Sequence, residues 1–151
     1  MSHFSSIEEI KEDNFSIITL WHVLEHIPNL DDTITLLQKK LSKDGRLIIA
    51  VPNFESWDAK HYKQFWAAYD VPRHIWHFSK QGIKTVFEKR NMTIEKILPM
   101  KFDSFYVSLL SEKHKTGKNR FMQAFLNGWR SNLKAKKENN YSSLIFVLKN
   151  T

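Results

Sequence analysis

The chain contains no cysteine and only four glycines among its 151 residues. Without cysteine it can form neither a disulfide framework nor a thiolate metal site, and its composition suits a reducing compartment. The glycines lie far apart, so no two of them build a loop that cradles a phosphate or a nucleotide. They are Gly45, Gly82, Gly117 and Gly128.

Long apolar runs are also missing. No stretch approaches the length needed to cross a bilayer, and the N-terminus lacks the charged-then-apolar layout of a secretory signal. We therefore expect a soluble, cytoplasmic protein that has no membrane partner.

Basic residues outnumber acidic ones, and the formal net charge is +7. Much of the excess lies late in the chain, in Lys113–Arg120 and Lys134–Lys137. A basic balance can indicate nucleic-acid binding, but a charge pattern alone is weak evidence and lysine dominates here. We favour solvated helix faces and do not expect nucleic acid as a partner.

Two apolar runs predict buried strands. They are Phe15–Trp21 and Arg46–Val51, and the second ends at Pro52, which cannot donate to a strand ladder. Such runs are typical of strands buried on both faces of a parallel sheet. Between them, apolar residues at helical spacing predict a helix and hence a strand–helix–strand unit: Leu30, Ile34, Leu37 and Leu41.

The predicted helix ends follow from local residue chemistry. We expect Asp31 or Asp32 to cap the first helix and Gly45 to close it in the left-handed conformation. Ser79 is expected to cap the next helix, and Asn91 to terminate it.

The remaining pattern predicts strands at Met92–Leu98 and Ser142–Leu148, with helices at Ser104–Glu112 and Lys118–Lys136. The second of these helices carries an apolar series of Phe121, Phe125, Trp129 and Leu133. The chain thus reads as one domain, with an entry segment (1–14), a β/α core (15–98), a helical insertion (99–141) and a last strand (142–148).

A polar cluster of His22, Glu25 and His26 follows the first strand, at the edge where open α/β sheets bind ligands. The cluster matches the inverted zinc-protease motif H-x-x-E-H. That chemistry needs both histidines on one continuous helix, which the preceding strand and Pro28 disfavour. We expect no metal at His22 and His26, and keep zinc hydrolysis as a minor alternative.

A second constellation lies in the predicted loop before Ser79, and it contains Arg73, His74, Trp76 and His77. Loop histidines can carry protons near neutral pH, or they can simply bond to nearby carbonyl groups, and the sequence leaves both readings open. Asn53 follows the second strand, where it could bind a ligand or turn the chain.

Together these motifs resemble class I methyltransferases that use S-adenosylmethionine, in the group related to quinone-biosynthesis methyltransferases. The resemblance is good from Phe15 to Ile97. It is carried by the order of Ile17–Leu24, Glu25-His26, Lys43–Gly45, Leu47–Asn53 and Pro72–Ser79.

The resemblance implies the C-terminal half of such an enzyme. Its fold is then a partial Rossmann-like α/β sheet of the fourth to seventh strands, without the family's glycine-rich unit. It implies a small-molecule methyl acceptor and S-adenosylmethionine as cofactor, with an incomplete cofactor site. We therefore expect this chain alone to bind the cofactor poorly and to be inactive.

The resemblance also assigns roles to individual residues. Leu20, Trp21 and His22 would border the cofactor, and His26 or His74 would act as a base. The acceptor would be bound by Glu25, Asn53, Arg73, Trp76 and His77.

Two further expectations follow. The chain could instead be a non-catalytic, methyltransferase-like partner module that has lost cofactor binding. In either case the predicted strand Phe15–Trp21 would lack a neighbour on one side, and exposed apolar edges recruit other chains. We therefore expect a homodimer formed through this edge.

Overall fold

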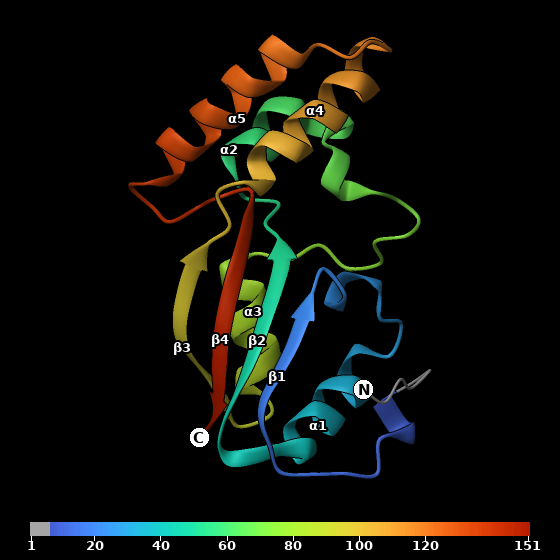
Figure 1. Cartoon of the computed structure of the whole chain (residues 1–151), viewed down its shortest axis with the longest axis vertical. Coiled ribbons are helices and arrows are strands. Elements are labelled where there is room, and N and C mark those ends of the chain that lie inside the picture. The colour runs from blue at the N-terminus through green and yellow to red at the C-terminus, as the bar shows by residue number, and fades with distance from the viewer. Residues whose placement is uncertain (1–6) are drawn as a thin grey trace.

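The computed structural model describes residues 7–151 and contains a four-stranded mixed sheet in the order β1-β2-β4-β3 (Figure 1). Strand β1 (Phe15–Trp21) runs parallel to β2 (Leu41–Pro52). Strand β4 (Ser143–Asn150) is antiparallel to both β2 and β3 (Met92–Pro99). The predicted partial α/β sheet is confirmed, with β1 and β3 as its edges.

The helices form two groups. Helices α1 (Leu30–Lys40) and α3 (Lys80–Glu88) lie beside the sheet, whereas α2 (Trp57–Tyr62), α4 (Asp103–Thr116) and α5 (Phe121–Ala135) gather beyond the carboxyl ends of β1 and β2 (Figure 1). We call the second group the helical cap. The short 3-10 helices are η1 (Ile7–Glu9), η2 (Leu24–His26), η3 (Lys63–Phe65) and η4 (Ala67–Tyr69). None of the helices within residues 7–151 is long and apolar enough to cross a membrane.

Each group has its own apolar core. The larger core joins the sheet to α1 and α3 through buried residues that include Leu47, Ile49, Phe146, Ile34 and Phe87. The smaller core joins α2 and α4 of the helical cap to the segment around η4, through Ala59, Tyr62, Trp66, Ala67, Ala68 and Val107. The carboxyl ends of β1 and β2 therefore meet the cap along a boundary between two cores.

Strand β1 is less buried than the sequence predicts. Leu20 is its only fully buried residue, while Ile17 and Trp21 are 61% and 51% exposed. Side chains alternate between the faces of a strand, and Ile18 and Leu20 point to the larger core whereas Ile17 and Trp21 point away. The prediction of burial on both faces is therefore wrong for β1.

The predicted ends of the first helix are also wrong. Helix α1 begins after Asn29, and Asp31 and Asp32 lie within its first turn, where carboxylates favour the positive end of the helix dipole. Gly45 lies inside β2 without a positive φ. A Cβ atom there would meet the carbonyl oxygen of Phe15 at 2.7 Å, so glycine allows the close approach of β1 and β2.

The two predictions at the ends of the next helix are confirmed. The hydroxyl of Ser79 accepts a hydrogen bond from the amide of Gly82 at 3.1 Å. Asn91 has a φ of 52°, in the left-handed region, and β3 begins at the next residue.

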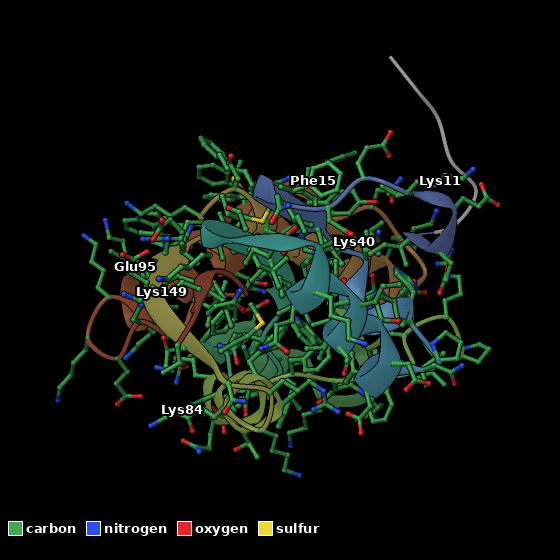
Figure 2. All side chains as sticks on the ribbon, turned by 90° about the horizontal axis from the view of Figure 1, so that it is seen from below. Lys11, Phe15, Lys40, Lys84, Glu95 and Lys149 are labelled. Atoms are coloured by element: carbon green, nitrogen blue, oxygen red, sulfur yellow. The ribbon has the colours of Figure 1, made fainter. Side chains whose placement is uncertain are left out.

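Lys40 anchors the entry segment to α1. Its ammonium donates hydrogen bonds to the carbonyl of Glu12 and to the carboxylate of Asp13, both at 3.2 Å. Figure 2 shows Lys40 near the segment that carries Lys11 and Phe15. The part of the predicted entry segment in residues 1–6 lies outside the described residues.

Helix α5 confirms the predicted helix but turns its large residues outward. The side chains of its apolar series, Phe121, Phe125, Trp129 and Leu133, are all exposed. The inward face consists of small and polar residues: Ala124, Asn127, Gly128, Ser131 and Ala135. Gly128 permits close packing with α4, because a Cβ atom there would approach Phe105 to 2.8 Å.

Candidate functional site

The site begins where β1 ends. His22 has a φ of 52°, and its amide donates a hydrogen bond to the carbonyl of Ala50 on β2 at 3.0 Å. The left-handed turn at His22 leads the chain into η2, which carries Glu25 and His26. Glu25 is only 1% exposed, so its carboxylate lies inside the protein.

The loop of residues 70–78 returns to this segment. The amides of Ile75 and Trp76 donate hydrogen bonds to the carbonyl oxygen of Glu25, at 2.9 and 3.2 Å. This backbone pairing brings His74 against η2, with the ring centroids of His26 and His74 only 4.6 Å apart. The two constellations predicted separately from the sequence thus form one cluster.

The tautomers of the two histidines follow from their partners. The Nδ1 atom of His26 lies 3.0 Å from the carbonyl oxygen of Arg73, and that of His74 lies 2.7 Å from the carbonyl oxygen of Ala68. A carbonyl oxygen only accepts hydrogen bonds, so both Nδ1 atoms carry hydrogen. In the neutral imidazole this leaves Nε2 with a free lone pair.

Two histidines lie at ion-pair distance from the Glu25 carboxylate. Its Oε1 atom is 3.3 Å from Nδ1 of His22 and 4.0 Å from Nε2 of His74. Hydrogen bonding to Glu25 raises the pKa of His22, and the partial burial of this imidazole opposes the rise. The contact therefore favours the protonated form of His22.

A cavity of about 530 Å³ opens beside this cluster. Helix α4 forms one wall, through Asp103, Tyr106 and His114, none of which the sequence analysis identified. Burial raises the pKa of Asp103, and a hydrogen bond donated by the hydroxyl of Ser143 opposes the rise. No local sequence pattern predicts this wall, because the wall forms only when the helical cap packs over the end of the sheet.

Four predicted site residues line the cavity: His22, His26, Arg73 and His74. The Arg73 guanidinium is largely exposed and pairs with the carboxylate of Asp70 at 2.7 Å. Glu25 lies beneath the cavity wall, in contact with the histidines.

The other predicted site residues lie elsewhere. Asn53 is buried, and its amide donates to the carbonyl of Tyr141 at 3.1 Å. The Nε2 atom of His77 bonds to the carbonyl of Tyr69 at 3.0 Å. Leu20 lies in the sheet core, and Trp21 and Trp76 are partly exposed outside the cavity lining.

The residues near the end of β1 do not by themselves fit S-adenosylmethionine. This molecule carries two ribose hydroxyls, an ammonium and a carboxylate, all of which need polar partners when bound. Of the residues that the resemblance places beside the cofactor, Leu20 has no polar group, Trp21 has a single indole donor, and His22 is already paired with Glu25. Within residues 7–151, no glycine loop follows β1.

The comparisons with known proteins agree on one family. A family model described as "Methyltransferase domain" matches residues 2–97, more than half of the chain. The chain belongs to this methyltransferase domain family. A search among curated proteins finds no match.

Solved methyltransferase structures have the same fold. The mitomycin 7-O-methyltransferase MmcR matches with a TM-score of 0.59 and 12% identity over 97% of this chain and 33% of its own. The cyclopropane synthase MmaA2 from Mycobacterium tuberculosis gives 0.54 and 12%, over 94% of this chain and 57% of its own. The cyclopropane synthase CmaA1, complexed with SAH and CTAB, gives 0.56 and 10%, with the same two coverages.

Because the sequence identities are low, these matches establish the fold and nothing more specific. The chain spans between a third and somewhat more than half of the length of these structures. They confirm the predicted likeness to the fold of class I methyltransferases.

Proposed function

We propose that the chain forms the acceptor-binding part of an S-adenosylmethionine-dependent methyltransferase that acts on a small molecule. One observation carries the proposal. This chain belongs to a methyltransferase domain family, and it has a cavity at the carboxyl ends of β1 and β2 that is lined by imidazole and carboxylate groups. In α/β sheets this edge is where ligands bind.

The proposed roles follow the geometry. His26 and His74 present a free Nε2 lone pair beside the cavity, so either can accept a proton from an acceptor. Arg73 offers a charged group to the acceptor, whereas Glu25 lies behind the cavity wall and would act through the histidines that it contacts. S-Adenosylmethionine, when bound, would supply an electrophilic methyl group. Of Leu20, Trp21 and His22, we assign only His22 to the wall next to it, because the other two do not line the cavity.

Asn53 and His77 receive structural roles in this proposal. Their polar atoms already bond to backbone carbonyl groups away from the cavity. Trp76 likewise holds the loop rather than the acceptor, because its indole nitrogen bonds to the backbone near η2.

A second candidate is a non-catalytic partner module with a methyltransferase fold. The poor fit of the residues around His22 to S-adenosylmethionine favours it. The two candidates differ in whether the protein binds this molecule and transfers its methyl group.

The test uses the 151-residue chain and the longest translation product that contains it. Calorimetry measures S-adenosylmethionine binding, and transfer of a labelled methyl group is measured against a panel of phenols, alcohols and amines. We expect transfer by the longer product and its loss in His26→Gln or His74→Gln, with His77→Gln unaffected. Absence of both binding and transfer in both forms supports the partner module instead.

A further inference from the structure

We propose that Glu25, His26 and His74 bind a divalent first-row transition metal ion. The carboxylate and the two imidazoles each offer one ligand atom, and these atoms lie within 4.8 Å of one another. No other three carboxylate or imidazole side chains among residues 7–151 meet in this way. Two elements build the site, since the first two residues lie on η2 and the third lies in the loop of residues 70–78.

The Glu25 carboxylate is the strongest sign of a missing cation. The residue is 1% exposed, and neither of its oxygens accepts a well-aligned hydrogen bond from residues 7–151. A buried charge of this kind is costly unless it is paired or bound to a metal. His22 at 3.3 Å approaches only Oε1 and leaves Oε2 without a partner among the described residues. A cation between Glu25, His26 and His74 would complete the environment of the carboxylate.

Both histidines are already prepared as ligands. Each donates its Nδ1–H group to a backbone carbonyl, from Arg73 in one case and Ala68 in the other. Metal-binding histidines usually carry such a bond, which fixes the tautomer and aims the other nitrogen at the ion. The ring centroids of the two histidines are only 4.6 Å apart. A purely structural role would not require two imidazoles with free nitrogens so close together, whereas a metal site would.

The donor set indicates the class of metal. Two imidazoles and one carboxylate bind zinc in hydrolases and iron in oxygenases, with coordination positions left open. Ligand atoms that share one zinc ion lie about 3.4 Å apart, so binding would draw the three atoms together by about 1 Å.

This site uses different ligands from those of the H-x-x-E-H motif in the sequence. The sequence led us to expect no metal ion, because His22 and His26 cannot lie on one continuous helix. The proposed site, which includes His26, departs from that expectation. In the structure His22 lies before η2, so the two histidines share no helix. The second imidazole comes from His74, which is far away in the sequence.

The role of the ion rests on the proposed acceptor site. It replaces the base role of His26 and His74, because their Nε2 lone pairs would then bind the metal. Open coordination positions would face the cavity that Arg73, Asp103 and Tyr106 help to line. A hydroxyl group bound to a metal ion loses its proton more readily, as metal-bound water does. The proton would pass to solvent water, and the acceptor oxygen would remain on the metal as an anion ready for methylation. The acceptor class is therefore an alcohol or a phenol.

The experiment measures metal binding without any catalytic readout. Chelator-treated chain is titrated with Co²⁺, followed by its visible absorption, and with Zn²⁺ in competition with a chromophoric chelator. We expect one ion per folded chain. Glu25→Gln, His26→Gln and His74→Gln should each weaken binding by about tenfold or more. The matched control is His77→Gln, from the same loop, which should bind as the parent does.

Thermal unfolding gives a second readout that separates misfolding from loss of a ligand. A bound ion stabilises the native state, so Zn²⁺ should raise the Tm of the parent and of His77→Gln but not that of Glu25→Gln. The proposal is overturned by absence of saturable binding to folded chain, or by equal weakening in His77→Gln. Metal binding by the longer translation product without methyl transfer would overturn the proposed function and leave the metal site standing.

Discussion

The indole nitrogen of Trp76 donates a hydrogen bond to the carbonyl oxygen of Ile27 at 2.8 Å. Together with the backbone bonds from this loop to Glu25, this contact fixes the position of His74 relative to η2. The candidate site therefore depends on a polar side chain that does not itself line the cavity.

Trp76→Phe should lower the free energy of unfolding by about 1 kcal/mol, because it removes one hydrogen bond and keeps most of the apolar contact. Urea denaturation measures the change. Trp129→Phe, on the exposed face of α5, is the matched control and should have a smaller effect. An equal loss in both variants would show that the contact to Ile27 contributes nothing.

Asp58 joins four parts of the helical cap and the sheet. It is fully buried on α2 and accepts hydrogen bonds from Trp66 at 2.9 Å and from Ser131 and Ser142, both at 2.7 Å. Asp58→Ala leaves three buried donors without an acceptor, so we expect a loss of about 3 kcal/mol or more in urea denaturation. Asp44→Ala, at an exposed position, should change stability little.

Replacing two glycines by alanine should change the stability of the chain in opposite directions. Gly45→Ala should destabilise the chain by about 1–3 kcal/mol, because the added methyl group meets the Phe15 carbonyl and the Leu41 side chain. Gly82→Ala should instead raise stability by about 0.5–1 kcal/mol, since it lies in α3 with only an ordinary contact at 3.4 Å to Ser79. Thermal unfolding of both variants checks the pair, and the same sign for both would contradict it.

Asp103 should make stability depend on pH. Burial raises its pKa in the folded chain, so the folded state holds this proton more tightly than the unfolded state does. Its contribution to stability is therefore greatest at low pH and is lost as the pH rises from the unfolded pKa of about 4 through the raised folded value.

Asp103→Asn removes this titration. Relative to the parent, the variant should gain stability as the pH rises from about 4 to about 7. Denaturation at several pH values measures the difference, and Asp44→Asn is the exposed control that should follow the parent. A difference that stays constant with pH would show that Asp103 does not titrate in this way.

The edge strand β1 motivates a prediction about association. It pairs only with β2 among the described strands, and Ile17 on its outer face is 61% exposed. We propose that the chain forms a homodimer through this edge, which light scattering should detect. Ile17→Lys should shift the chain toward the monomer, whereas Leu98→Lys on the opposite edge strand β3 should not. A parent that stays monomeric at tens of micromolar would refute the proposal.

The sequence predicted the order of the main strands and helices because their periodicity is local. It also predicted the polar residues at the end of β1 and the histidine loop. It could not predict the exposure of β1, which depends on what packs against each face. Nor could it predict the true role of Gly45, because the contact with Phe15 exists only when β1 and β2 are paired.

The candidate site was only partly predictable for a similar reason. His26 and Arg73 bond to each other across 47 residues, and no local pattern encodes that distance. Asp103 and His114 join the cavity from the helical cap, whose position over the sheet is a tertiary property. Several residues of the site could therefore be predicted from the sequence, but their arrangement in space could not.

The outward-facing side chains of α5 have a consequence for how the cap reaches its native form. Burial of apolar surface alone would favour this helix turned about its axis, with Phe125 and Trp129 inside. Its observed rotation is selected instead by polar contacts on the other side, from Asn127 to Tyr62 at 2.9 Å and from Ser131 to Asp58 at 2.7 Å. The orientation of α5 in the native chain therefore depends on hydrogen bonds and not on burial of its largest apolar side chains.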